Sequence, residues 1–274
     1  MRLKIKHLVC VPLASGPRAF PSVREVLLRI FWKPITLFHI RRVPVQIHSS
    51  YLIYPGGLFA WDLCLEDASR GLLRSMGWLL VYSCSLLVHE FGHVFAARRS
   101  GVSSRRVILI PLGALAELES MPRGRGEFWI AIGGPLASVV LVGTFWLSLR
   151  ASPPGLFWFL EIRPLLRFGY VMNLIVAIFN LLPCFPMDGG RILRSGLALF
   201  VGRAFPQHAG QAFLIATRIA VRYVSWPVAL GVMAWTIIDT QIWLHLLLFP
   251  LLLYLAEGEY WLLRTESPSK SNDL

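Results

Sequence analysis

The pentapeptide HEFGH at residues 89–93 places three polar side chains at a spacing that suits metal chemistry. Positions i and i+4 lie on one face of a helix, so His89 and His93 can bind a single Zn²⁺ there. Glu90 lies beside them, where its carboxylate can take a proton from metal-bound water. The motif follows the apolar run LLVYSCSLLV, and a charged group at bilayer depth costs about 2.5–3.5 kcal/mol. A metal ligand pair therefore explains these residues better than a surface helix with paired polar groups.

A third ligand must come from elsewhere, because a catalytic zinc ion normally has three protein ligands and a water molecule. Acidic residues are scarce, and Asp188 is the best placed of them. It ends an apolar stretch and precedes two glycines, which allow close backbone approach. The alternative is that Asp188 only caps a helix that begins at Gly189. Glu117 and Glu119 are nearer the motif, but they alternate with apolar residues as in a strand.

The composition predicts a polytopic membrane protein, since 55% of the 274 residues are hydrophobic and only 15% are charged. The net charge of +12 comes without an RNA- or DNA-binding motif. No nucleic-acid partner is therefore expected, and the basic residues fit the cytoplasmic edges of membrane spans better. The four cysteines show no CxxC spacing, so neither a disulfide framework nor a cysteine zinc site is indicated.

Hydrophobic runs predict an α-helical fold with about six transmembrane helices and a small β-sheet or hairpin at the membrane edge. The first span is weak and is interrupted by Pro55, Gly56 and Gly57. Residues 190–203 indicate a short helix outside the core. The predicted spans are 49–61, 76–97, 128–149, 165–182, 219–237 and 240–256, and the strand patterns lie at 43–47, 105–111 and 112–120.

The chain divides by charge into three parts. Residues 1–40 form a basic cytoplasmic or interfacial segment, in which 21–34 indicates a short interfacial helix or else a disordered basic arm. Residues 41–256 form the membrane domain, and 257–274 form a polar tail. With the N-terminus and C-terminus both cytoplasmic, 22 of the 27 Lys and Arg residues fall on the inside. In this multi-pass orientation, the HEFGH motif lies toward the cytoplasmic side.

Three blocks of sequence together resemble one known family. HEFGH on the second span, GGPLAS (133–138) on the third and FNLLPCFPMDGGR (179–191) after the fourth are similar to motifs of the site-2 intramembrane metalloproteases. The likeness covers roughly residues 40–200 and is greatest to the compact bacterial branch, which includes the sporulation protease that processes a pro-sigma factor. The paired HExxH and NxxPxxPxDGG motifs are far more specific than HExxH alone.

The resemblance implies a role for each of these residues and one Zn²⁺ per chain. By it, His89, His93 and Asp188 correspond to the metal ligands and Glu90 to the catalytic base. Asn180 matches a family residue that contacts the substrate or the developing oxyanion, with a helix-end amide that binds freed carbonyls as the alternative. Ser138 stands where the family motif often has Asn, so a polar role there is open. The stretch PLGALAELES, with Gly113 at its turn, matches the hairpin that receives the substrate as an added strand.

The expected function is a zinc metalloendopeptidase that cuts transmembrane segments of membrane-tethered proteins near the cytoplasmic side, in regulated intramembrane proteolysis. Its expected partners are the lipid bilayer and a single-span substrate, such as a membrane-tethered transcription factor, sigma factor or anti-sigma factor. The internal loops are too short for a PDZ domain. Two alternatives remain open at this point: a non-catalytic relative that binds membrane helices, and a divalent-metal transporter.

Overall fold

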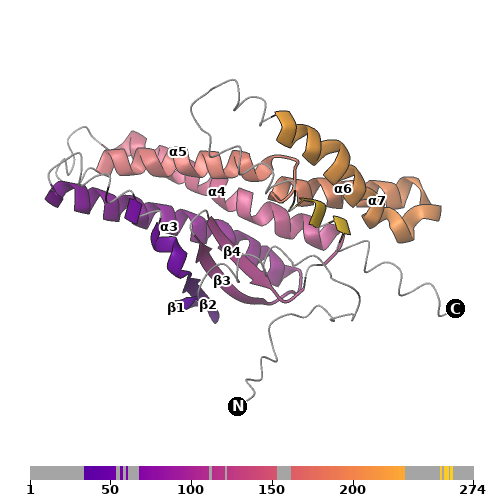
Figure 1. Cartoon of the computed structure of the whole chain (residues 1–274), viewed down its shortest axis with the longest axis horizontal. Helices are drawn as coiled ribbons and strands as arrows, with labels where there is room; N and C mark the ends of the chain where they lie inside the picture. The colour runs from indigo at the N-terminus through magenta and orange to yellow at the C-terminus, as the bar shows by residue number, and fades with distance from the viewer. Residues whose placement is uncertain are drawn as a thin grey trace, which may run out of the picture.

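The structure, a computed structural model, describes residues 34–53, 68–110, 113–120, 122–152 and 162–231, with a few positions from 56 to 60 and from 254 to 261. Three long helices run side by side in it (Figure 1), namely α3 (Ala68–Arg99), α4 (Arg125–Ala151) and α5 (Ile162–Leu181). A small sheet lies beside α3, and α6 (Asp188–Ala204) and α7 (Ala212–Arg218) follow α5 in the chain. The predicted helical fold with a small sheet is confirmed.

Four helices in the described part of the chain are long and apolar enough to cross a membrane. They are Arg74–Arg99, Arg125–Ala151, Ile162–Leu181 and Ala209–Gly231. The first three match predicted spans, and the fourth begins about ten residues before the predicted 219–237. Large apolar side chains on their surfaces are exposed, as lipid contact requires. The chain is therefore a multi-pass membrane protein. Of the predicted span 49–61, residues 49–53, 56, 57 and 60 are described, and the short 3₁₀ helix η1 (Ser49–Leu52) begins it. Most of the predicted span 240–256, and the predicted helix 21–34 apart from Pro34, lie outside the described residues.

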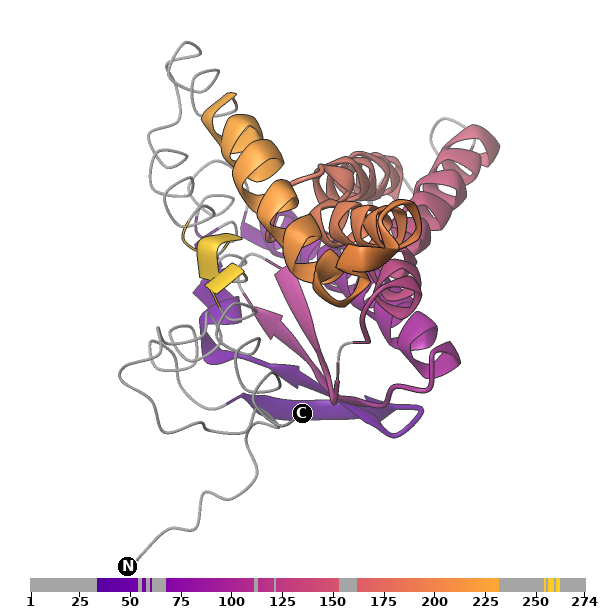
Figure 2. The same ribbon diagram turned by 90° about the vertical axis from the view of Figure 1, so that its right-hand side faces the viewer.

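The sheet has four strands in the order β1-β2-β3-β4, and Figure 2 shows it below the helices. Its strands are β1 (Ile35–Ile40), β2 (Val43–Ile47), β3 (Ser104–Ile110) and β4 (Gly113–Leu118). β2 and β3 pair in parallel, whereas the other two pairs are antiparallel. The sequence predicted β2, β3 and β4 but not β1, whose run ITLFHI does not alternate. The expected domain division at residue 40 therefore falls between two paired strands.

The sheet is anchored to α3 through a small apolar core. Val43 of β2, Val107 of β3 and Val94 of α3 are each at most 2% exposed and pack together. Val94 directly follows the HEFGH motif, so this contact fixes the motif relative to the sheet. β4 is one of the two edge strands and lies against α3. The sheet edge and the motif are thereby held next to each other.

The helix predicted over 190–203 exists as α6, but it packs against α4 instead of lying outside the core. The helix carries three arginines, a residue type that is rarely buried unless it is paired. The structure buries one of them, Arg194, together with its neighbour Ser195, by pairing both with an acid on α4. Paired charges can be buried where single ones cannot.

Helices α3 and α4 approach closely where each has a glycine. A methyl group added at Gly92 would overlap the Gly133 carbonyl oxygen and come within 2.9 Å of Ala137 Cβ. A methyl group at Gly133 would in turn lie 2.5 Å from the Gly92 carbonyl oxygen. The backbones can meet at this distance only without side chains. The crossing brings the HEFGH motif against the first half of α4.

We predict that Gly92→Ala destabilises the metal-free protein. Overpacking costs typically about 1–3 kcal/mol, which exceeds the gain of about 1 kcal/mol in helix propensity. Thermal unfolding in detergent measures the effect. Gly196→Ala on α6 is the control, because its added methyl meets no atom within 4 Å. Equal unfolding temperatures for Gly92→Ala and the wild type would contradict the close approach.

Candidate metal centre

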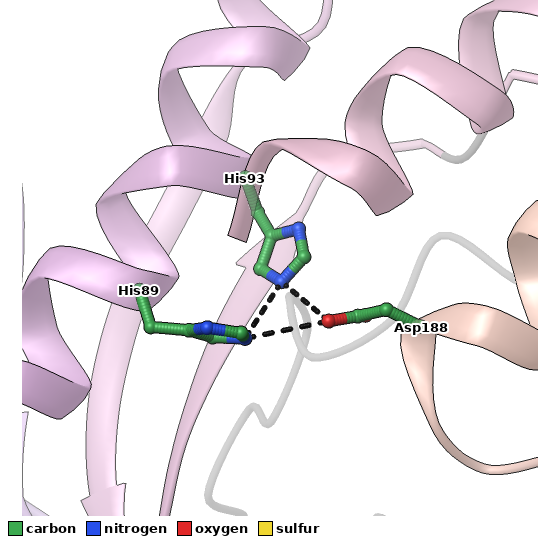
Figure 3. A group of neighbouring side chains, drawn as sticks. All are labelled: His89, His93 and Asp188. Carbon is green, nitrogen blue, oxygen red and sulfur yellow. Dashed lines mark hydrogen bonds and ion pairs between the residues drawn. The ribbon is translucent and has the colours of Figure 1, made fainter. Parts of the chain in front are cut away.

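Three side chains from two helices converge on one point (Figure 3). His89 and His93 project from one face of α3, and Asp188 is the first residue of α6. The two Nε2 atoms lie 3.3 Å and 3.2 Å from Asp188 Oδ2, and 3.3 Å from each other. The structure thus brings together the two imidazoles and the carboxylate that the sequence singled out, although 95 residues separate His93 from Asp188.

These separations are those of a tetrahedral metal site. Ligand bonds of about 2.0–2.1 Å in tetrahedral geometry place neighbouring ligand atoms about 3.3 Å apart. All three observed separations fall within about 0.1 Å of that value. Two imidazole nitrogens and one carboxylate oxygen form a ligand set typical of catalytic zinc, in which water takes the fourth position. The residues therefore fit Zn²⁺ in both type and position.

Each imidazole is oriented by a hydrogen bond at Nδ1, the ring nitrogen that faces away from the metal centre. His93 Nδ1–H donates to the Ile130 carbonyl oxygen at 2.7 Å, and His89 Nδ1 is hydrogen-bonded to the Ser138 hydroxyl at 2.9 Å. Both partners belong to α4. A neutral ring that donates from Nδ1 presents an unprotonated Nε2, which is the form that binds a metal. The bonds thus orient both rings toward the same point.

Without a cation, this arrangement leaves acceptors facing one another. The Nε2 lone pairs converge on Asp188 Oδ2, which is buried and has no hydrogen-bond partner among the described residues. Burial raises the pKa of the Asp188 carboxyl. In the metal-free protein, however, a proton on an imidazole Nε2 can lie between these atoms, and the hydrogen bonds so formed outweigh burial and hold the pKa of the Asp188 carboxyl well below its ordinary range. The group is therefore ionised at neutral pH. A divalent cation satisfies all three atoms at once.

Gly134 on α4 leaves the room that this centre needs. A methyl group built there would overlap His93 Nε2 and lie 2.7 Å from His89 Nε2. No larger residue fits without moving an imidazole. The GGPLAS block thus supports the centre with its backbone at Gly134 and with its hydroxyl at Ser138.

Glu90 lines a cavity together with the candidate ligands, and it is hydrogen-bonded by the sheet. Its Oε2 accepts a hydrogen bond of 2.8 Å from the Ala116 backbone N–H of β4. The carboxylate is half-buried and lies next to the ligands without being one of them. This is the position that a general base needs, within reach of water at the metal.

The centre opens into a cavity of about 180 Å³, which has room for several water molecules. Asn180 lines this cavity, and its amide also donates to the Val176 carbonyl oxygen at 2.9 Å, so both predicted roles remain compatible with its place. Ser138 is fully buried behind His89, and Gly113 lies at the start of β4. Neither of these two lines the cavity. Their position favours support of a ligand for Ser138 and a turn for Gly113.

Three polar residues near the site were not singled out from the sequence. Glu127 and Arg191 line the cavity. Asn173 of α5 is fully buried, and its amide hydrogen-bonds Ser85 of α3 at 2.8 Å, one helical turn before His89. The sequence signal that could have identified them is a polar side chain inside or beside an apolar run. Placing such a side chain in a membrane costs free energy unless it has a polar partner.

Comparison with known proteins gives consistent matches. Models of Peptidase family M50 match residues 77–159 and 151–222. A zinc metalloprotease of Methanocaldococcus jannaschii is 32% identical over 166 residues, which are 60% of this chain and 45% of that protein. Stage IV sporulation protein FB of Bacillus subtilis is 33% identical over 137 residues, 49% of this chain and 44% of that protein. The chain spans less than half the length of these curated relatives.

Among solved structures, the site-2 protease from Methanocaldococcus jannaschii has a similar fold. The TM-score is 0.53 with 23% sequence identity, and the match covers 83% of this chain and 95% of the other. The match to the family confirms the resemblance that the three motifs indicated. The family match indicates zinc as the cofactor, and His89, His93 and Asp188 form a group that could hold it.

We predict that Gly134→Ala weakens zinc binding by at least about 10-fold, the lower end of what loss of support around a metal ligand costs. The added methyl displaces His93 Nε2 without removing any ligand. Chelator competition on the purified full chain measures the dissociation constant. Gly143→Ala on the same helix is the matched control, since its methyl meets nothing within 4 Å. Wild-type affinity in Gly134→Ala would show that the ligands do not depend on this space.

Proposed function

Since this chain belongs to Peptidase family M50, we propose that it is an intramembrane zinc metalloendopeptidase. It cleaves transmembrane segments of membrane-tethered proteins near the cytoplasmic side. The observation that carries this proposal is the centre itself: three ligands in tetrahedral positions, with Glu90 beside them on a cavity. Two similar proteins carry the name zinc metalloprotease or putative zinc metalloprotease, which supports the proposal further.

The chain supplies a base and a hydrated site for peptide hydrolysis. Bound zinc supplies a Lewis acid that lowers the pKa of water toward about 7 and polarises a carbonyl group. Glu90 accepts the proton of the attacking water and can pass it to the leaving amine. Asn180 lies on the same cavity, where its amide can contact the substrate or the developing oxyanion.

Water reaches the site because the ligands lie near one end of their helix. His93 and His89 precede Arg99, the last residue of α3, by six and ten residues. At a rise of 1.5 Å per residue, they lie about 9–15 Å from that end. The helix ends in two arginines, Arg98 and Arg99. Such residues favour the cytoplasmic face, so we place the site in that leaflet and both termini on that side.

The substrate binds as a strand along β4, in β-augmentation. A transmembrane helix must unwind before it is cut, and its freed backbone groups then need partners. β4 is an edge strand, and its Ala116 N–H points away from β3, toward Glu90. Ala114 N–H points the same way, because residues alternate along an antiparallel pair. Its partner Leu109 directs its carbonyl away from β4, toward His48 N–H, which agrees with this alternation.

The expected alternatives receive less support. A metal transporter needs ligands along a path through several spans, whereas one group of potential ligands is found among the described residues. A non-catalytic helix-binding relative needs neither Glu90 nor three converging ligands. The identity of the substrate, including whether it is a membrane-tethered transcription, sigma or anti-sigma factor, is open to the test below.

We predict that Glu90→Gln keeps zinc but lowers cleavage by about 10²–10⁴-fold, the range for loss of a general base. Gln keeps the size and the acceptor for Ala116 N–H but cannot take a proton. Co-expression with each variant in the source cell, followed by comparison of uncut membrane proteins, measures cleavage and finds the substrate. Glu119→Gln, at an exposed position, is the control. Undiminished proteolysis by Glu90→Gln would remove Glu90 from the mechanism.

We predict that Ala114→Pro lowers cleavage of a membrane substrate by about 10-fold or more while zinc affinity stays unchanged. Proline removes only the N–H that points away from β3, and edge strands tolerate proline at such positions. Loss of one hydrogen bond that a buried group cannot replace costs about 1–3 kcal/mol, equivalent to about 5–150-fold. Ala114→Val keeps the N–H and adds comparable bulk, so it serves as the matched control. If both variants cleave equally, pairing along β4 is not how the substrate binds.

A further inference from the structure

A buried ion pair joins α4 to α6 beside the cavity of the metal centre. Glu127 in the first turn of α4 is fully buried, and Arg194 of α6 is 4% exposed. The Arg194 guanidinium donates to Glu127 Oε1, and the Ser195 hydroxyl donates to Oε2 at 2.8 Å. Both carboxylate oxygens of Glu127 are therefore bound by α6. None of the three residues is a candidate metal ligand or base.

The pair and the metal centre lie on one antiparallel seam between the helices. Ser195 follows Asp188 by seven residues, so both lie on the same face of α6, two turns apart. Glu127 precedes Gly134 by seven residues on α4, and Gly134 lies against the two imidazoles. At one end of the seam Glu127 contacts Ser195, and at the other Asp188 meets the imidazoles. About 10.5 Å of helix separates the two ends on each side.

Arg194 also contacts the segment that leads into Asp188. Its guanidinium stacks over the Phe185 ring at 4.8 Å and over the Phe213 ring of α7 at 4.9 Å. Phe185 is 3% exposed and precedes Asp188 by three residues. Its backbone N–H donates to the Ser225 hydroxyl at 2.9 Å. One arginine thus links α4, α7 and the segment before the third ligand.

The Asp188 side chain is not fixed by a helix cap. No side chain caps the start of α6, because the N-cap residue is Met187 and makes no cap hydrogen bond. Asp188 Oδ2 has no hydrogen-bond partner among the described residues. Its position therefore follows that of α6 and of the backbone at residues 181–185, against which Gly189 and Gly190 pack closely. A metal ligand distance tolerates only about 0.2 Å, and a rotation of α6 by one residue would turn the carboxylate away by 100°.

Stability alone does not explain a buried ion pair here. The desolvation of two charges commonly offsets their attraction, and apolar replacements of such pairs are often neutral or stabilising. A role in fixing one register between helices is the best-attested use of such groups. The geometry fits that role, since the pair fixes α6 on α4, and α4 is also the helix that orients the two imidazoles of α3.

We propose that Glu127 is a positioning residue: by binding Arg194 and Ser195 it sets the register of α6, so that Asp188 completes the metal centre. This inference concerns the centre and not the substrate. Zinc binding therefore tests it independently of any cleavage assay, and failure of the proposed protease function would leave it standing.

The experiment compares Glu127→Gln with wild type as purified full chains. We expect zinc affinity to fall by about 10-fold, the lower end for residues that support a ligand, and the visible spectrum of the Co²⁺-substituted protein to lose its tetrahedral form. Ser195→Ala, which keeps the ion pair, should show a smaller loss of affinity. Glu257→Gln is the control, because it breaks a more exposed Glu–Arg pair with Arg222 at 3.5 Å.

Unfolding of the metal-free proteins is measured in parallel. A merely structural role would lower the unfolding temperature of Glu127→Gln and leave zinc affinity and the Co²⁺ spectrum of the folded protein as in the wild type. That result would overturn the proposal. If Glu127→Gln does not fold, Arg194→Lys and Ser195→Ala decide, and wild-type zinc affinity and spectra in both would equally overturn it.

Discussion

Three acceptor atoms face one another in the candidate metal centre. The need to hold them together accounts for the contacts that the surrounding helices make. The two Nε2 atoms and Asp188 Oδ2 lie 3.2–3.3 Å apart in a buried place. Lone pairs at such distances repel unless a cation lies between them. Metal binding therefore stabilises the position of Asp188, the first residue of α6, beside the two imidazoles of α3. The free energy of binding is in part the free energy of holding the two helices together.

Helix α4 contacts and positions α3 and α6, the two helices that carry the candidate metal ligands. Its paired glycines allow α3 to approach, and Gly134 leaves space for the imidazoles. Its Ile130 carbonyl and Ser138 hydroxyl orient them. Its first turn holds α6 through Glu127. One helix thus contacts both ligand-bearing helices at points spread over three turns. Because each support is backbone, hydroxyl or a paired charge, it remains compatible with a largely apolar span.

The sequence predicted features that depend on residues close together in the chain. It did not predict features that depend on partners far away in the chain. His89, Glu90 and His93 could be identified because their spacing is set by one helix. Asp188 stood out because acids are scarce, but only the resemblance of FNLLPCFPMDGGR (179–191) to a family motif favoured a ligand over a helix cap. Glu127 looks like an ordinary acid at a helix start, where the dipole favours it. Its role became visible only with Arg194, 67 residues away. Likewise β1 has apolar residues on both faces, so no alternation marked it as a strand.

Peptide hydrolysis in a bilayer requires water, a base and exposed substrate backbone in the same small volume, and each is excluded by lipid. The cavity beside the centre gathers these requirements because β4 forms one wall and the ligands form another. Glu90 lies between them, with its carboxylate bound to the outward N–H of Ala116. A strand that adds to β4 would run past the base and within reach of the metal. In the proposed mechanism the edge strand therefore has two roles: it supplies hydrogen-bond partners to an unwound backbone, and it aligns that backbone with Glu90 and the metal centre.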